Sequence, residues 1–142
     1  MPPVIAEYIE GLRTHDVEKI GGTVWDDMVF VSTARALGKQ EFLHFLRCLY
    51  IAFPDWHYEH DPPEWREDEI SIKWRQGGTH QAVFAMPGIA PVAATHRLVK
   101  LPEQFFFYRL RRDKISEIRP EPIPGGAPSG ILRQIGIEVP IL

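Results

Sequence analysis

The sequence predicts an α+β fold in which N-terminal helices pack on a strongly curved antiparallel sheet. Two observations support this prediction. Apolar residues repeat at helical spacing in the first part of the chain, and from residue 56 onward they alternate with period two. Helices followed by a run of strands indicate segregated α+β packing. A curved sheet closed by helices is a cone, and we expect a ligand cavity at its mouth.

Composition favours one globular domain over residues 1–142, because 44% hydrophobic and 25% charged side chains are ordinary globular usage. The net charge is −3 and no run of Lys or Arg exceeds two residues, which argues against nucleic-acid binding. The single cysteine, Cys48, excludes an intramolecular disulfide. No segment approaches the ~20 apolar residues of a membrane span. We therefore expect no membrane contact and, by default, a cytoplasmic location.

Helical spacing marks two long segments and one short one in the first part of the chain. Residues 3–13 place their large apolar side chains on one face. Asp16 suits the N-cap of a short second helix. Residues 38–53 carry the strongest amphipathic stripe, which Pro54 ends.

The remaining chain is predicted to form short strands and a closing helix. The expected strands are 28–31, 56–60, 70–75, 79–84, 94–101, 103–111 and 115–119. The proline-rich segment 120–128 is incompatible with a helix or a central strand. Ser129 is the expected N-cap of a short closing helix.

Several aromatic residues suggest that the cavity is lined by rings. We expect Trp25, Trp56 and Trp74 to contribute to it, together with Met86 and Phe107. Packing in the core or at an interface between copies is the alternative explanation for each tryptophan.

Metal binding is not expected from this sequence. The only close histidine pair, His57 and His60, is three residues apart on a predicted strand, and the two side chains therefore point to opposite faces. A third ligand is missing from this neighbourhood, so we expect neither a metal nor another cofactor.

Six short motifs follow one another along most of the chain. They are Gly38-Lys39-x-Glu41-Phe42, Phe53-Pro54-Asp55-Trp56, Trp74 with Gly78-Thr79-His80, Ala94-Thr95-His96-Arg97, Asp113-Lys114-Ile115-Ser116-Glu117, and Ile131-Leu132-Arg133-Gln134-Ile135-Gly136. In this order they resemble the SnoaL-like polyketide cyclases of the NTF2-like superfamily. The resemblance implies a cone-shaped fold, a homodimer formed through the sheet face, and ring closure by intramolecular aldol condensation. Alternating aromatic residues at 104–110 suit such a dimer interface.

One departure from the family concerns the general base. The resemblance places an aspartate near Ile123, where this chain has none, and Glu121 is the acid closest to that place. Glu121 is therefore our candidate base, with a solvated loop acid as the alternative. His80 and His96 are the other titratable candidates, although a cross-strand hydrogen bond or simple exposure also explains them. Arg109 matches a polar position of the family and is the candidate electrostatic partner.

Three kinds of function remain open at this point. The first is a cofactor-independent cyclase or isomerase that acts on a hydrophobic, polyketide-like carbonyl compound by acid–base catalysis. The second is a pocket that binds a hydrophobic small molecule without catalysis. The third is an interaction module that uses the sheet face.

Overall fold

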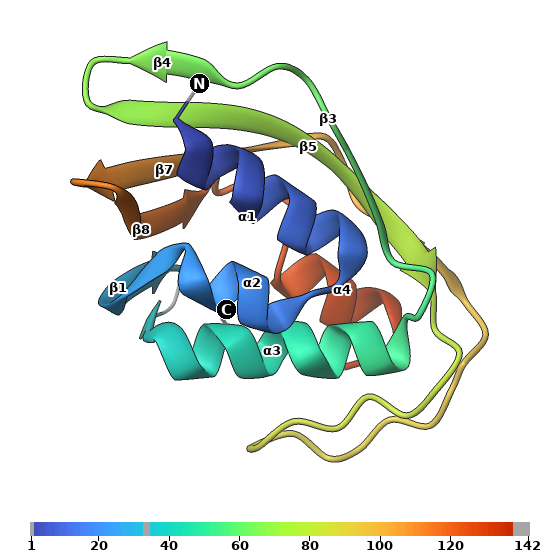
Figure 1. Cartoon of the computed structure of the whole chain (residues 1–142). Coiled ribbons are helices and arrows are strands. Elements are labelled where there is room, and N and C mark those ends of the chain that lie inside the picture. Colours follow the sequence, from blue (N-terminus) through green and yellow to red (C-terminus); the bar gives the residue numbers. More distant parts are fainter. Residues whose placement is uncertain (1, 33–34, 138–142) are drawn as a thin grey trace.

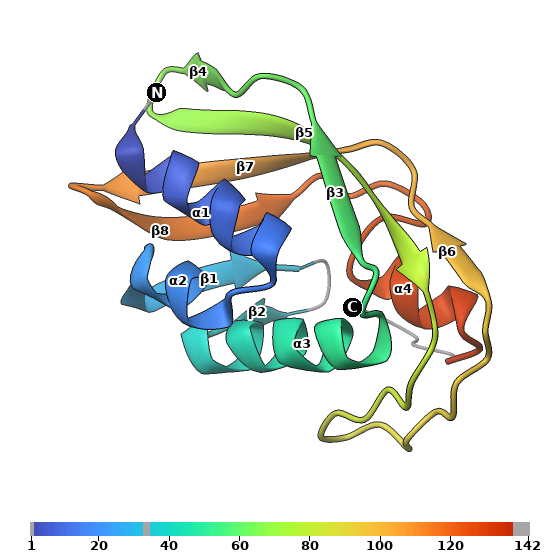
Figure 2. The ribbon, with the colours of Figure 1, turned by 45° about the vertical axis from the view of Figure 1, so that its right-hand side comes forward.

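A computed structural model describes residues 2–32 and 35–137, which form a cone of helices and strands (Figure 1). The helices in this part of the chain are α1 (Pro3–Thr14), α2 (Val17–Gly22), α3 (Lys39–Ala52) and α4 (Ser129–Gln134). The strands are β1 (Val24–Val31), β2 (Ala36–Leu37), β3 (His57–His60), β4 (Glu64–Arg66), β5 (Glu69–Thr79), β6 (Leu98–Lys100), β7 (Gln104–Arg111) and β8 (Lys114–Pro120). Figures 1 and 2 show α1, α3 and α4 within the curve of the sheet. The predicted α+β cone is confirmed.

The helix boundaries follow local capping chemistry. The Asp16 carboxylate accepts a hydrogen bond from the Lys19 backbone N–H at 3.0 Å, which starts α2 as predicted. The Gly38 N–H donates to the Glu41 carboxylate at 3.2 Å and thereby caps α3. Pro54 follows the end of α3.

The strands form one sheet in the order β2-β1-β8-β7-β5-β3, and β4 and β6 also pair with β5. Every pair is antiparallel except β1 with β8, which run parallel with Phe30 opposite Ile118. The sheet is therefore mixed where the sequence predicted antiparallel strands. Parallel neighbours need a long crossover connection. The whole stretch from β2 to β7 provides it, and no local pattern indicates such a distant pairing.

An arm of residues 80–97 joins β5 to β6 and extends past α3 (Figure 2). We expected a strand over 79–84, but Thr79 is the last residue of β5, and of residues 80–84 only Phe84 forms a bridge, with Val92. The N–H groups of Gln81 and Ala82 both donate to the Ala52 carbonyl at the end of α3, so they are not available to the sheet.

Two clusters of buried side chains make up the core, and α3 contributes to both. One cluster fills the space between α1, α2 and the sheet, with Ile20, Ile72 and Ile118 fully buried. The other lies under the arm and α4, with Phe84 and Leu132 fully buried. Residues from both clusters border a cavity, which makes it the interior of the cone.

Candidate functional site

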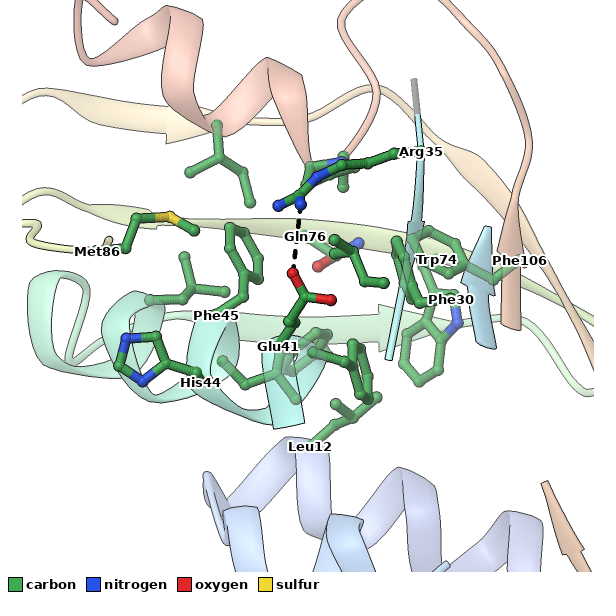
Figure 3. A pocket seen from close by; sticks show the side chains of 18 of the residues that line it. Leu12, Phe30, Arg35, Glu41, His44, Phe45, Trp74, Gln76, Met86 and Phe106 are labelled. Carbon is green, nitrogen blue, oxygen red and sulfur yellow. Dashed lines mark ion pairs between the residues drawn. The ribbon is translucent and has the colours of Figure 1, made fainter. Parts of the chain in front are cut away.

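A cavity of about 480 Å³ lies between the helices and the concave face of the sheet. This volume is typical of small-molecule sites. Figure 3 shows that its walls are mostly apolar and aromatic. The apolar lining includes Leu12, Phe30, Phe45, Leu49, Phe106 and Ile131.

The four tyrosines of the chain form one group with Trp74 beside this cavity, here called the tyrosine cluster. The rings of Tyr8 and Tyr108 are 5.3 Å apart, and those of Tyr58 and Trp74 are 5.6 Å apart. The hydroxyls of Tyr50 and Tyr58 are 2.6 Å apart and share a hydrogen bond. Three of the tyrosines, from α1, β3 and β7, line the cavity itself.

Tyr108 is oriented so that it can donate a hydrogen bond. Trp74 Nε1 donates to Tyr108 Oη at 2.9 Å. An indole N–H has no acceptor function, so the Tyr108 oxygen is the acceptor and its own O–H hydrogen can donate. A hydrogen bond between the Tyr8 and Tyr108 hydroxyls also contributes to the pKa shifts of both residues. Burial raises the pKa of Tyr108, Tyr8 and Tyr58 above the ordinary phenol value. These phenols are therefore neutral donors at physiological pH.

Charged groups occur at the exposed end of the cavity, here called the mouth. Arg35 Nη1 lies 3.3 Å from Glu41 Oε2, and these side chains are 59% and 53% exposed. Figure 3 shows this ion pair beside the lining. The other Glu41 oxygen accepts the α3 cap from Gly38. The Glu41 carboxylate is therefore occupied twice and is a poor candidate for a free base.

His44 and Met86 also border the mouth. His44 Nε2 is 3.6 Å from Cys48 Sγ, and the Cys48 thiol donates to the Ala85 carbonyl at 3.0 Å. Burial raises the pKa of the Cys48 thiol, so the sulfur keeps its proton. With that hydrogen directed at Ala85, the contact favours an Nε2–H donor and a free lone pair on Nδ1 of His44.

His80 and His96, two predicted catalytic residues, do not line the cavity. His80 is fully buried at the base of the arm and stacks on Phe53 with 5.2 Å between ring centres. Its Nδ1 accepts from the Thr95 N–H at 3.2 Å, and its backbone carbonyl accepts from His96. Burial lowers the pKa of His80, which favours the neutral ring. His96 is exposed at a positive φ of 59°. Both residues therefore help to fix the conformation of the arm.

Glu121, the predicted base, lines a second and smaller cavity of about 200 Å³. Its Oε1 accepts from the Phe105 N–H at 3.2 Å, and its own N–H donates to the Phe105 carbonyl. The structure therefore does not bring Glu121, His80 and His96 together in one cavity. Glu121 directly follows the end of β8.

The predicted ring lining is present in part. Trp74 and Met86 line the cavity as expected. Trp56 does not line the cavity. Its Nε1 donates to Gln76 Oε1 at 3.3 Å, and Gln76 is the residue that lines the cavity there. Trp25 is outside, with its Nε1 donating to a backbone carbonyl of β7 at 2.7 Å.

Phe107 and Arg109 lie on the outer face of the sheet and not in the cavity. Successive strand residues point to opposite faces, so Phe106 and Tyr108 take the inner positions of β7. Arg109 Nε is 3.7 Å from a carboxylate oxygen of Glu69 on the neighbouring strand. Arg109 therefore makes a surface ion pair and does not line the cavity.

The polar residues that do line the interior were not singled out from the sequence. They are Tyr8, Tyr58, Gln76 and Tyr108, with His44 at the mouth. Strand alternation on β7 puts Tyr108 on the same face as Phe106 and the cavity wall, but only once the phase of the strand is known. The tyrosine cluster as a whole can be recognised only in the folded structure, because its members come from α1, α3, β3 and β7.

Within residues 2–32 and 35–137, no group of three or more His, Cys, Asp or Glu side chains is placed to hold a metal ion. In the same ranges, no helix has the length and apolarity needed to cross a membrane.

A cone of helices and curved sheet around an aromatic cavity is the NTF2-like architecture, and solved structures share it. AclR from Streptomyces galilaeus, provisionally assigned as a hydroxylase, is 20% identical with a TM-score of 0.72 over 94% of this chain and 92% of that one. IdmH from Streptomyces antibioticus, provisionally assigned as a polyketide cyclase, is 19% identical with a TM-score of 0.66 over 94% and 96%. An NTF2-like protein of unknown function from Burkholderia pseudomallei K96243 is 12% identical with a TM-score of 0.69 over 94% and 95%.

The sequence itself identifies the family. The sequence model of SnoaL-like polyketide cyclases matches residues 4–121. The chain therefore belongs to the SnoaL-like polyketide cyclase family. No curated protein matches it significantly in sequence. The family match ends at Glu121, directly before the loop that leads to α4.

Proposed function

We propose that this protein binds a hydrophobic, polyketide-like carbonyl compound in its cavity and promotes an enolate-forming step, as a cofactor-independent cyclase or isomerase. One observation carries the proposal. An apolar cavity of about 480 Å³ is lined by a neutral phenol, Tyr108, whose oxygen accepts from Trp74 and whose own O–H hydrogen can donate to Tyr8 or to a ligand. An oriented donor in an apolar site is the arrangement that stabilises a developing oxyanion.

The chemistry follows from these positions. A base removes a proton from the carbon next to the carbonyl, and the electron pair of that C–H bond moves to the carbonyl oxygen as an enolate. Tyr108 donates a hydrogen bond to this oxygen and keeps its own proton, because burial raises its pKa. In a cyclase the enolate carbon then forms a C–C bond to a second carbonyl carbon of the same ligand, and the π electrons of that carbonyl move to its oxygen. The proton held by the base passes to this alkoxide, which closes the ring as a hydroxyketone and regenerates the base.

His44 is the candidate base. It is the imidazole that borders the cavity among the residues that the structure describes. Its contact with Cys48 favours a free lone pair on Nδ1. Glu41, the carboxylate at the mouth, is engaged by Arg35 and by the α3 cap.

Binding without catalysis is the second candidate. It is favoured by the position of the charged groups, because the polar residues of the interior are neutral and the titratable groups are at the exposed mouth. A homodimer remains part of the proposal, with Phe105 and Phe107 on the outer face as its apolar contribution.

Deuterium exchange separates the two candidates. β-Tetralone, an aromatic ketone with acidified α-hydrogens, is incubated in deuterium oxide with the wild type, with His44→Gln, or with His57→Gln as the exposed control. Catalysis predicts exchange that is faster than background in the wild type and in His57→Gln, and slowed roughly a hundredfold in His44→Gln. Binding without any acceleration of exchange would support the second candidate. Binding is followed through quenching of the intrinsic tryptophan fluorescence, to which Trp74 in the cavity wall contributes.

A further inference from the structure

Two residues separate the main cavity from the second one. Among the residues that the structure describes, Ala127 and Pro128 alone line both cavities. The other lining residues of the two cavities differ, so these two residues form a thin partition between them. A wall of this kind ends the space available to a ligand in the main cavity.

The partition is held in place by one buried side chain. Gln104 is 2% exposed and makes three hydrogen bonds to the loop. Its Nε2 donates to the carbonyls of Glu121 and Ala127 at 2.9 and 3.3 Å, and its Oε1 accepts from the Ala127 N–H at 2.9 Å. A buried amide with these bonds fixes a loop that lacks ladder partners of its own.

The loop also approaches Gln104 too closely to move inward. A Cβ at Gly126 would lie 2.7 Å from Gln104 Nε2, so glycine is needed for this contact. The family match ends at Glu121, which places the partition in a segment outside the matched region.

The donor and the partition lie along the same strand. The inward side chains of β7 are Tyr108, Phe106 and then Gln104, which is opposite Trp74 on β5. Four residues of strand span about 13 Å. A ligand with its carbonyl oxygen at Tyr108 that extends over Phe106 therefore meets the partition at its far end.

We propose that Ala127 and Pro128 form the end wall that sets the length of the bound ligand, and that Gln104 is the residue that positions this wall. The inference rests on the proposed binding of a carbonyl compound and names its specificity-determining residues. A bulkier side chain at Ala127 shortens the site, and a smaller one opens it toward the second cavity. Loss of the Gln104 amide lets the wall move.

The test measures the affinity of alkyl phenyl ketones of increasing chain length: acetophenone, hexanophenone, decanophenone and tetradecanophenone. Quenching of the intrinsic tryptophan fluorescence, to which Trp74 in the cavity wall contributes, gives the dissociation constants. In the wild type the affinity rises with chain length and then falls once the chain exceeds the site. Ala127→Leu moves this maximum to a shorter ketone, with decanophenone weakened roughly tenfold or more. Ala127→Gly moves it to a longer ketone.

Gln104→Leu removes the three hydrogen bonds of Gln104 to the loop while the side-chain volume stays similar. We expect this variant to lose the sharp maximum of affinity against ketone chain length. Gln134→Leu is the matched control, because Gln134 also bridges backbone groups, with Lys100, but away from the wall. This control keeps the wild-type maximum. If Ala127→Leu binds every ketone with wild-type affinity, Ala127 does not form the end wall of the site. If the wild type binds none of the ketones, both the proposed function and the end wall are wrong. If it binds them but Ala127→Leu does not change the preferred length, only the end wall is wrong.

Discussion

The two faces of the central strands use the same backbone for different purposes. On the inner face, Ile72 pairs with Phe106 across β5 and β7, and the side chains are buried and uncharged. On the outer face, Arg109 lies between Glu69 and Glu117 on the neighbouring strands, in a half-exposed row of alternating charge. The comparison teaches that position relative to the sheet, and not residue type, decides which aromatic and polar residues meet a ligand.

The largest expected effect contrasts two neighbouring phenylalanines on β7. Phe106→Ala removes a ring that is 8% exposed and should reduce the free energy of unfolding by about 3 kcal/mol. Phe107→Ala removes an outer ring that Arg119 covers at 4.8 Å, and we expect a loss of about 1 kcal/mol. Urea unfolding of both variants measures the difference. Equal losses would contradict the assignment of an inner and an outer face, or would place the outer face in an interface.

The next effect concerns the hydrogen bond inside the tyrosine cluster. Tyr108→Phe leaves the buried Trp74 N–H without its acceptor, at a cost of about 1–3 kcal/mol in the free energy of unfolding. The same variant should weaken decanophenone binding roughly tenfold, because the donor to the carbonyl is lost. Tyr50→Phe is the control, since Tyr50 shares a hydrogen bond with Tyr58 but does not line the cavity. Unchanged ketone affinity in Tyr108→Phe would argue against this donor.

A smaller effect follows from the pH dependence of stability. Burial lowers the pKa of His80 below its ordinary value of 6.5. Below pH 6.5 this histidine is therefore protonated in the unfolded chain while it is still neutral in the folded chain. This contribution to stability is therefore complete above pH 6.5 and is lost as the pH falls. His80→Phe should have a flatter stability profile between pH 6.5 and more acid values, whereas the exposed His57→Gln should keep the wild-type slope. Identical slopes in all three proteins would show that His80 is not a buried neutral histidine.

The smallest effect belongs to the outer charge row. Arg109 is half exposed, and its ion pairs with Glu69 and Glu117 are 3.7 and 3.6 Å long. Arg109→Gln should change the free energy of unfolding by about 0–1 kcal/mol, and less at high salt. Decanophenone affinity should not change. A loss of ketone binding in this variant would show that Arg109 contributes to the binding site.

Much of the fold was predictable because its signals are local. The amphipathic stripe before Pro54 and the capping carboxylate of Asp16 fix helices through their own neighbours. The parallel pairing of β1 with β8 and the short strands β2 and β4 were not predicted, since they depend on contacts between distant or very short segments. The absence of a strand over 80–84 has the same cause, because the N–H groups of Gln81 and Ala82 donate to the Ala52 carbonyl.

The site was predictable only in part, and strand phase explains the difference. Trp74 and Met86 line the cavity as expected. Phe107 and Arg109 fall one residue out of phase with Phe106 and Tyr108, and a run of consecutive aromatics offers no alternation from which the phase could be read. His80 matched a motif of the family, but motifs in folded domains also mark structural hydrogen bonds.

The central claim is that Tyr108 donates a hydrogen bond to the carbonyl oxygen of a ligand held in the cavity. The isotope-edited infrared spectrum of bound decanophenone tests it most directly. We predict that the carbonyl stretch in the wild-type complex lies at lower frequency than in an apolar solvent, and that it returns to the solvent value in Tyr108→Phe. A bound ketone whose carbonyl frequency equals that in an apolar solvent for both proteins would contradict the account.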